Sequence, residues 1–399
     1  MARSYTSKRA PIKDVNINFF LYVYRIMASF KLLCSKCKRE YPIESKIWKC
    51  YCGNFLDISI HIEESTDYFE QVKSRIHTMW RYWELLPVSR KCLISIGEGW
   101  TPIIKKNYRN TVLLLKLEYL NPTGSFKDRG ASTLISHLAS IGIKDIVEDS
   151  SGNAGAAIAA YSAAAGIKCR IYVPEKAPHP KVLQIKSYGA DVIQVSGDRA
   201  HVHNEALKAA EKSFYAGHLW SPFFIEGLKT IAYESFEQFG DVDSLIVPIG
   251  SGGLALGIYK GFRDLLEIGA IKQMPRIYGV QAEGFTTVYE ILHPGYRGEK
   301  PSKILADGIA VPNPPRRYQI AYRLKETHGD IVVVNNREII EALYRLARWG
   351  LFVEPTSATA LAAFEKLKEN NIIERGERIL LPLTGFGLKA IDKISNLLG

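Results

Sequence analysis

The sequence predicts an α/β protein whose sheets are mainly parallel and are covered by helices on both faces. From residue 96 onward, short apolar runs of strand length alternate with longer helical stretches, and this alternation is typical of parallel sheets in α/β folds. The composition, 47% hydrophobic and 23% charged, is ordinary for a folded protein and shows no bias toward disorder. A chain of 399 residues is long enough for two or three domains.

The N-terminal part of the chain is organised differently from the rest. Residues 1–30 form a basic extension in which we expect little order; the part before Met27 lacks periodicity and is either an over-long start or a genuine extension. Residues 31–60 carry four of the six cysteines and form a separate small module. Residues 61–95 contain Trp, Tyr and Phe at helix-compatible spacing, and we expect these side chains to pack in a core.

The alternating region supplies the strands and helices of the predicted sheets. Strands are expected at residues 112–117, 145–147, 170–173, 191–195, 244–248, 276–280, 331–334 and 379–383. Helices are expected at residues 132–140, 153–165, 182–187, 254–266, 336–348 and 357–368. No apolar run approaches the roughly 18–20 residues that a spanning helix needs, so we expect no membrane partner.

The net charge of +11 is concentrated near the N-terminus. Residues 1–60 hold 11 Lys/Arg and 4 Asp/Glu, which gives +7, and the other residues together carry +4. A basic segment can bind nucleic acid, but a solvated basic surface explains the same pattern, and we expect no nucleic-acid partner. No small-residue cleavage site follows the short apolar stretch 19–24, so we predict no signal peptide and a cytoplasmic location.

Four clustered cysteines have the spacing of a metal site. Cys34 and Cys37 form a Cys-x2-Cys knuckle, and Cys50 and Cys52 form a second pair that is one residue shorter than usual. Four thiolates can complete the tetrahedron of a closed structural zinc site, and Gly53 allows the tight turn after the second pair. We therefore expect a zinc-ribbon-like module with one structural zinc. The alternative is a reduced, metal-free hairpin.

The segment 121–130, which reads NPTGSFKDRG, joins a predicted strand to a helix that begins at Lys127. Asn-Pro and Gly are turn residues. The positive end of the helix and the neighbouring Arg129 both favour the neutral, nucleophilic form of the amine. A lysine at a helix start is usually just exposed to solvent, but the surrounding ten residues argue against that explanation here.

Three further strand-to-helix junctions carry small and polar residues. Residues 150–155 read SSGNAG, which can cap a helix or cradle a carboxylate. Residues 250–254 read GSGGL, a turn that lets backbone N–H groups close around a phosphate. Residues 383–387 read LTGFG, where a hydroxyl can bond a heterocycle nitrogen or simply form part of a turn. Ligands bind at such strand ends in open α/β sheets.

In this order, the four junctions resemble the β-family of pyridoxal-phosphate (PLP) enzymes, the fold type II group that is similar to the tryptophan synthase β subunit. Within that family the sequence most resembles threonine synthases, from residues 97–102 (GEGWTP) to residues 387–389. Residues 121–130 are close to the cofactor-lysine segment of threonine synthases, and residues 354–358 (EPTSA) fit as well. A Cys-bearing front module also recurs in that family.

The resemblance implies two three-layer α/β domains behind the small N-terminal Cys-rich module. The large, PLP-binding domain would comprise residues 61–134 and 233–399, and the smaller α/β domain residues 135–232. A homodimer is an expected assembly.

The resemblance also assigns roles to residues of the four junctions. Lys127 would hold PLP as a Schiff base, Asn153 would hydrogen-bond the ring hydroxyl oxygen, and Thr384 would face the pyridine nitrogen. The cofactor phosphate would be held by Gly250, Ser251, Gly252, Gly253 and Leu254, and the substrate carboxylate by Ser150, Ser151, Gly152 and Ala154. A neutral hydroxyl at the ring nitrogen leaves the ring a milder electron sink, which suits elimination and replacement chemistry.

The implied activity is that of a lyase that converts O-phospho-L-homoserine and water to L-threonine and phosphate. Four residues depart from the usual pattern: Phe224, where an Arg often helps to hold the substrate phosphate, Ser251, Leu254 and Phe386. A serine/threonine dehydratase, or a β-replacement enzyme acting on another (phospho)amino acid, is therefore the alternative. A non-catalytic protein that binds a partner through residues 1–60 is a third hypothesis, against which Lys127 argues.

Overall fold

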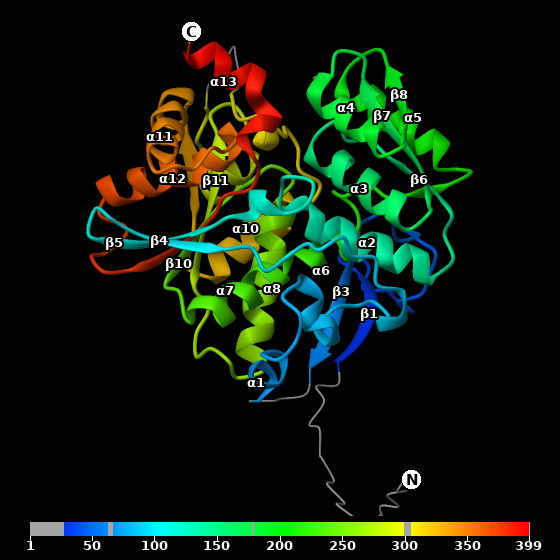
Figure 1. The fold of residues 1–399 in the computed structure, drawn as a ribbon, viewed down its shortest axis with the longest axis horizontal. Coiled ribbons are helices and arrows are strands. Elements are labelled where there is room, and N and C mark those ends of the chain that lie inside the picture. Colours follow the sequence, from blue (N-terminus) through cyan, green and yellow to red (C-terminus); the bar gives the residue numbers. More distant parts are fainter. Residues whose placement is uncertain (1–27, 63–66, 178, 299–304, 399) are drawn as a thin grey trace, which may run out of the picture.

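The computed structural model describes residues 28–62, 67–177, 179–298 and 305–398, and its strands form three sheets (Figure 1). The strands are β1 (Ala28–Cys34), β2 (Glu40–Tyr41), β3 (Leu56–Ile62), β4 (Ile103–Tyr108), β5 (Thr111–Lys116), β6 (Asp145–Glu148), β7 (Lys168–Pro174), β8 (Asp191–Val195), β9 (Phe214–Tyr215), β10 (Ser244–Pro248), β11 (Arg276–Ala282), β12 (Ile331–Val334) and β13 (Arg378–Pro382). The α-helices are α1 (Tyr68–Val72), α2 (Lys127–Ser140), α3 (Asn153–Ala164), α4 (His179–Ser187), α5 (Arg199–Ala209), α6 (Pro222–Leu228), α7 (Thr230–Phe239), α8 (Gly253–Glu267), α9 (Thr287–Leu292), α10 (Arg317–Glu326), α11 (Asn336–Arg348), α12 (Pro355–Glu369) and α13 (Ile391–Leu398). Short 3-10 helices span Met79–Leu85, Arg90–Cys92, Glu118–Leu120, Asp307–Ile309 and Gly387–Ala390. No described helix combines the length and the apolarity needed to span a bilayer.

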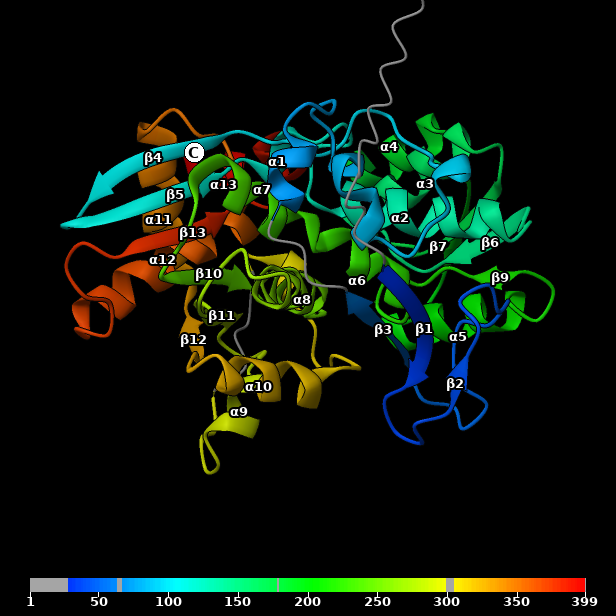
Figure 2. The ribbon, with the colours of Figure 1, turned by 90° about the horizontal axis from the view of Figure 1, so that it is seen from below.

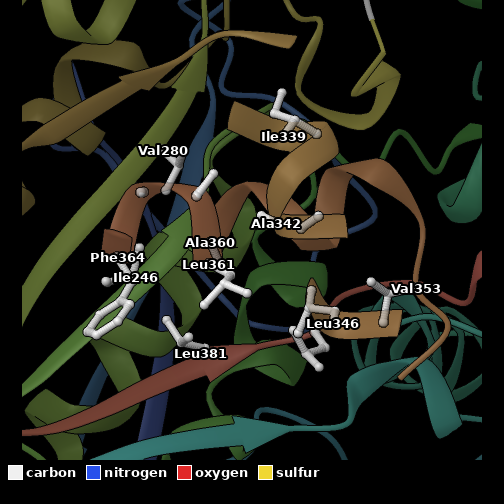
Figure 3. Close-up of a cluster of buried hydrophobic side chains, with 14 of the residues drawn as sticks. Ile246, Val280, Ile339, Ala342, Leu346, Val353, Ala360, Leu361, Phe364 and Leu381 are labelled. Atoms are coloured by element: carbon white, nitrogen blue, oxygen red, sulfur yellow. The ribbon is translucent and has the colours of Figure 1, made fainter. Parts of the chain in front are cut away.

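The six-stranded sheet has the order β12-β11-β10-β13-β5-β4 and is parallel except for β4, which pairs antiparallel with β5. Successive residues of β5 point to opposite faces. Leu114 packs in a core with α7, α8 and α10, whereas Leu113 and Leu115 pack in a second core with α11 and α12. Figure 3 shows this second core, in which Leu361 of α12 lies beside Leu381 of β13. The sheet is buried on both faces, which explains its continuous apolar strands.

The four-stranded sheet, β8-β7-β6-β9, is parallel throughout. Ile146 and Ile171 belong to a core shared with α2, α3, α4 and α6. Val147, the next residue of β6, instead packs with Tyr215 of β9 and Ala206 of α5. This sheet and its helices lie to the right of the larger sheet in Figure 1.

Strands β1, β2 and β3 form a three-stranded antiparallel sheet that carries the Cys module. Trp48 of the module packs edge-to-face on Tyr215 and Trp220, with ring centroids 4.8 Å and 5.4 Å away. The buried Arg316 donates hydrogen bonds to the carbonyl oxygens of Leu56 in the module and of Trp220 in the main body. Figure 2 shows the module beside α5 and β9. The module is thus packed against the body that carries the other two sheets.

The strands and helices predicted from residue 112 onward are all present, with ends shifted by a few residues. The largest shift is at α2, which begins at Lys127, as the junction motif predicts, rather than at residue 132. Strands β4 and β9 were not predicted. The domain limits stay a prediction. The expected boundaries near residues 134 and 232 fall inside helices α2 and α7. Of the predicted extension, residues 1–27 lie outside the described residues, and β1 begins at Ala28.

The start of α2 is anchored by a buried network of charged side chains. Arg129 bonds Glu118 through Nε at 2.7 Å and Glu234 through Nη1 at 2.5 Å, and Lys116 bonds Glu234 at 2.9 Å. All four side chains are fully buried. Removing one partner of a buried ion pair typically costs about 3–5 kcal/mol, so the network holds α2, and with it Lys127, in one position.

Candidate active site

The four junctions meet at one cavity of about 340 Å³. Of the residues predicted to bind cofactor or substrate, those that line it are Lys127, Ser150, Ser151, Gly152, Asn153, Ala154, Gly250, Ser251, Gly252, Leu254 and Thr384. Gly253 does not line the cavity but is the first residue of α8 behind it. The cavity lies at the carboxyl ends of β6, β10 and β13, the usual place for a ligand in an open α/β sheet.

Lys127 presents its amine to this cavity. Among the described residues, Nζ has no hydrogen-bond or ion-pair partner, and it lies 4.8 Å from the ring centroid of Phe126 and 5.6 Å from that of Phe224. Burial lowers the pKa of Lys127 to about 8. The neutral, nucleophilic form of this amine is therefore much more populated near neutral pH than that of an exposed lysine.

The expected contribution of Arg129 to this lowered pKa is not found. The guanidinium of Arg129 is neutralised by Glu118 and Glu234 within the buried network, and burial of the Lys127 amine accounts for the direction of the shift. The sequence motif and the cavity indicate the same lysine, but the electrostatic reason expected from Arg129 is wrong.

Asn153, the first residue of α3, has an unsatisfied amide oxygen beside the cavity. Its Nδ2 donates to both carboxylate oxygens of Glu354, at 3.2 Å and 3.1 Å. Its Oδ1 is buried and has no hydrogen-bond partner among the described residues. Buried polar atoms are rarely left without a partner, so this oxygen marks a position that a polar ligand atom fits.

The glycine-rich loop leads into the N-terminus of α8. Gly252 has a φ of +82°, in the left-handed region, and a Cβ there would lie 2.0 Å from Cδ1 of Ile320. Only glycine fits this position. The first N–H groups of α8 have no partner within the helix, and such a helix start favours anions.

Thr384 lies at the cavity wall at the end of β13. Its hydroxyl is 3.0 Å from Oγ of Ser357, which also accepts a hydrogen bond from the N–H of Gly385 at 2.9 Å. Ser357 thus orients the Thr384 side chain, whose neutral hydroxyl belongs to the cavity lining.

The cavity also contains charged and polar side chains to which the sequence analysis gave no role: Lys181, Arg199, His218, Asp307 and Glu354. Lys181 bonds Asp307 at 3.1 Å, and Arg199 bonds a carboxylate oxygen of Asp149 at 3.1 Å. Lys181 and Arg199 occur in no motif, and the fold alone brings them to the site. Glu354 could have been found, because it opens the EPTSA segment that carries part of the resemblance.

Known proteins match this chain in sequence and in fold. A family described as pyridoxal-phosphate dependent enzyme matches residues 94–385, which include the first three junctions and Thr384 of the fourth. A threonine synthase of Methanocaldococcus jannaschii is 37% identical over 379 residues, covering 90% of this chain and 93% of that protein. The chain belongs to the threonine synthase family of pyridoxal-phosphate-dependent enzymes.

Further members of the threonine synthase family cover the chain to a similar extent. A threonine synthase of Methanosarcina acetivorans is 32% identical over 375 residues, 90% of this chain and 92% of that protein. Among solved structures, the processed form of threonine deaminase isoform 2 from Solanum lycopersicum superposes with a TM-score of 0.66 over 84% of this chain and 90% of that chain, at 23% identity, which shows a shared fold. The predicted fold class and the dependence on PLP are thereby confirmed.

Proposed function

We propose that this member of the threonine synthase family converts O-phospho-L-homoserine and water to L-threonine and phosphate. The observation that carries the proposal is the presence of Lys181 and Arg199 in the lining that Lys127 shares. Lys181 is paired there with Asp307, and the Arg199 side chain is 49% exposed. An amino-acid substrate with a second anionic group at its far end matches these two cations. Serine and threonine have no group of that kind.

The residues of the cavity fit PLP. Lys127 offers a largely unpartnered amine for the aldehyde, and the amide of Asn153 offers a partner for the ring hydroxyl. Residues 250–254 and the start of α8 offer N–H groups for the phosphate, and Thr384 offers a hydroxyl for the pyridine nitrogen. When bound, PLP withdraws electrons from the substrate and makes the proton on its Cα acidic.

Lys127 is the group that we assign to proton transfer at the substrate carbon atoms. Its amine takes the proton from Cα and then exchanges protons at Cβ and Cγ, while the Cγ–O bond to phosphate breaks and water adds at Cβ. The substrate carboxylate would be held at the start of α3 by N–H and hydroxyl groups of Ser150, Ser151, Gly152 and Ala154.

Phe224 stands where family members often have an arginine that helps to hold the substrate phosphate. We assign phosphate binding in this chain to Arg199 together with Lys181. Phe224 is 1% exposed, and a Cβ on Gly130 would lie 2.4 Å from Cδ1 of its ring, so this position serves packing. The Arg199 side chain is 49% exposed and lines the cavity. Its planar guanidinium offers the paired donors that phosphate oxygens accept.

A comparison of substrates tests the proposed function. The PLP-loaded protein is given O-phospho-L-homoserine, O-phospho-L-serine, L-serine or L-threonine, and phosphate, threonine, ammonia and keto acids are measured. We expect equal amounts of phosphate and threonine from the first substrate. Keto acid and ammonia from serine or threonine, with no reaction of O-phospho-L-homoserine, would support a dehydratase instead.

An arginine substitution locates the phosphate end of the substrate. Arg199→Ala should raise KM for O-phospho-L-homoserine at least about tenfold, because a charge-assisted hydrogen bond contributes about 1.5–3 kcal/mol. Arg170→Ala is the matched control, since Arg170 pairs with Asp145 at 2.8 Å but does not line the cavity. An unchanged KM in the Arg199 variant would place the phosphate elsewhere.

We also propose that the Cys module binds one structural zinc ion. The sulfur atoms of Cys34, Cys37, Cys50 and Cys52 lie within 4.8 Å of one another, and the Cys34–Cys52 and Cys37–Cys50 pairs are each 3.5 Å apart. Sulfur ligands at about 2.3 Å from a tetrahedral zinc are roughly 3.8 Å apart, so little movement would be needed. Gly53 has a φ of +83°, in keeping with the turn expected after the second pair.

The cytoplasmic location and the homodimer expected from the sequence are part of the same proposal. Sedimentation of the purified protein tests whether it is a homodimer.

A further inference from the structure

A buried glutamate holds a histidine at the cavity, next to Lys127. His218 lines the cavity, its Nδ1 lies 2.7 Å from Oε1 of Glu148, and its backbone N–H donates to Oε2 at 3.2 Å. Glu148 is fully buried at the end of β6. Glu148 thus holds both the imidazole, through Nδ1, and the backbone of His218. Among the described residues, Nε2 has no partner, so this nitrogen is left for the cavity.

The pair is electrostatically linked to Lys127. The ring centroid of Phe224 lies 5.6 Å from Nζ of Lys127 and 5.7 Å from the ring of His218. Burial, and then the positive charge of Lys127, lower the pKa of His218 well below its usual value. Burial, and then the charge of Asp149, raise the pKa of Glu148 well above its usual value. Both shifts favour an uncharged pair in which Glu148 holds the proton near Nδ1 and Nε2 carries the ring proton.

We propose that His218, backed by Glu148, is a second proton-transfer group of this site, which serves the oxygen atoms of the reaction while Lys127 serves the carbon atoms. This inference rests on the proposed conversion of O-phospho-L-homoserine. His218 would act as a catalytic residue, and Glu148 would act through it.

The proton balance closes over one turnover. As the Cγ–O bond breaks, its electron pair stays on the departing phosphate oxygen, which takes the proton from Nε2 of His218 while the proton of Glu148 moves to Nδ1. When water adds, its oxygen forms the bond to Cβ and its proton goes to Nε2, while the proton on Nδ1 returns to Glu148. The pair ends as it began, because the proton that it gives to phosphate is replaced by the proton that it takes from water.

Two variants test the pair, with a third as a matched control. His218→Asn and Glu148→Gln should each lower kcat for phosphate release at least about 100-fold, the usual contribution of general acid–base catalysis. His293→Asn should leave kcat unchanged, because His293 bonds Asp330 at a similar distance, 2.8 Å, but the pair is partly exposed and His293 does not line the cavity. The PLP dissociation constant of all variants should stay near that of the wild type, since none of the three residues is assigned to the cofactor.

Isotope exchange separates the carbon and oxygen steps. In D2O, the substrate recovered from the His218→Asn reaction should carry deuterium at Cα, because Lys127 still acts there while phosphate departure is slowed. Glu148→Gln keeps a hydrogen-bonding partner for Nδ1 but cannot pass a proton, so full activity of that variant would overturn the relay. Wild-type kcat in His218→Asn would overturn the inference alone, whereas a wild type that makes no threonine would overturn the proposed function as well.

Discussion

Lys127 and Lys389 differ in the surroundings of their amines, although burial lowers the pKa of each to about 8. The amine of Lys389 donates to the carbonyl oxygen of Thr123 at 2.7 Å and to Oε1 of Gln184 at 2.8 Å. That of Lys127 faces the cavity and has no such partner among the described residues. A nucleophilic amine must be free as well as neutral, so Lys127 is the one of the two expected to hold the cofactor.

Replacing Lys127 by Ala should abolish both the reaction and the covalent attachment of PLP. Lys389→Met should keep the attachment, because it removes a half-buried lysine of the same pKa that does not line the cavity. Borohydride reduction followed by peptide mass spectrometry locates the attached cofactor. Its mass on a peptide of the Lys127→Ala protein would contradict the assignment.

The lowered pKa of Lys127 predicts how PLP attachment depends on pH. The neutral amine reacts, and its share rises as the pH passes through about 8. The rate at which the cofactor-free protein captures PLP should therefore rise about tenfold between pH 7 and pH 9 and then level off. Stopped-flow absorbance measures this rate. A rate that keeps rising steeply above pH 9 would show an ordinary lysine pKa.

Local motifs predicted some of the site residues, and long-range contacts supplied the others. Lys127, Asn153 and Thr384 lie in short segments whose turn and helix-start residues can be recognised directly in the sequence. His218 and Glu148 are 70 residues apart, and neither lies in such a motif. A histidine and a glutamate acquire a joint role only when the fold places them 2.7 Å apart.

The N-terminus of α8 makes a separate prediction about cofactor affinity. Gly252→Ala should weaken PLP binding, because the left-handed φ of +82° disfavours a side chain and the new Cβ would collide with Ile320. Gly269→Ala is the matched control: it has a φ of +75°, nothing within 4 Å of its Cβ position, and a place just beyond the other end of the same helix, which is roughly 22 Å long. PLP titration followed by absorbance gives both dissociation constants. Equal values for the two variants would mean that the loop has been misread.

The Cys module makes a prediction about metal content and stability. Cys50→Ser should lose bound zinc and lower the melting temperature, because a structural zinc contributes much of the folding free energy of a small module. Cys92→Ser should do neither, since Cys92 lies outside the cluster. Elemental analysis of protein prepared without added metal gives the zinc content. Well under one zinc per chain, with the module still folded, would rule the site out.

At the level of elements, the hydrophobic pattern predicted the positions of strands that are buried on both faces of the sheet. The runs that form β5, β10 and β13 are apolar because both faces of their sheet are covered, and their positions were predicted within a residue or two. Strand β4 escaped prediction because it lies at the edge of the sheet and reads IIKKNY, with lysines where a buried strand would be apolar. Charged residues are common on such edges.

Across the whole molecule, composition and spacing set the Cys module apart as a separate unit, whereas in the structure it packs against the body that carries the other two sheets. Trp48 packs on Tyr215 and Trp220, two residues that flank His218 in the chain. Tyr215 in turn donates a hydrogen bond to Asp149 at 2.7 Å, next to Glu148. Composition and spacing could define the module but not this contact, because it depends on the packing of segments far apart in the sequence.

The central claim is that phosphate leaves by cleavage of its bond to carbon and that water then adds to a different carbon. The reaction of the PLP-loaded protein with O-phospho-L-homoserine in water enriched in oxygen-18 tests this claim most directly. Mass spectrometry should find one heavy oxygen in the hydroxyl group of threonine and none in the released phosphate. Heavy oxygen in the phosphate, with homoserine as the other product, would show simple phosphate-ester hydrolysis and would contradict the account.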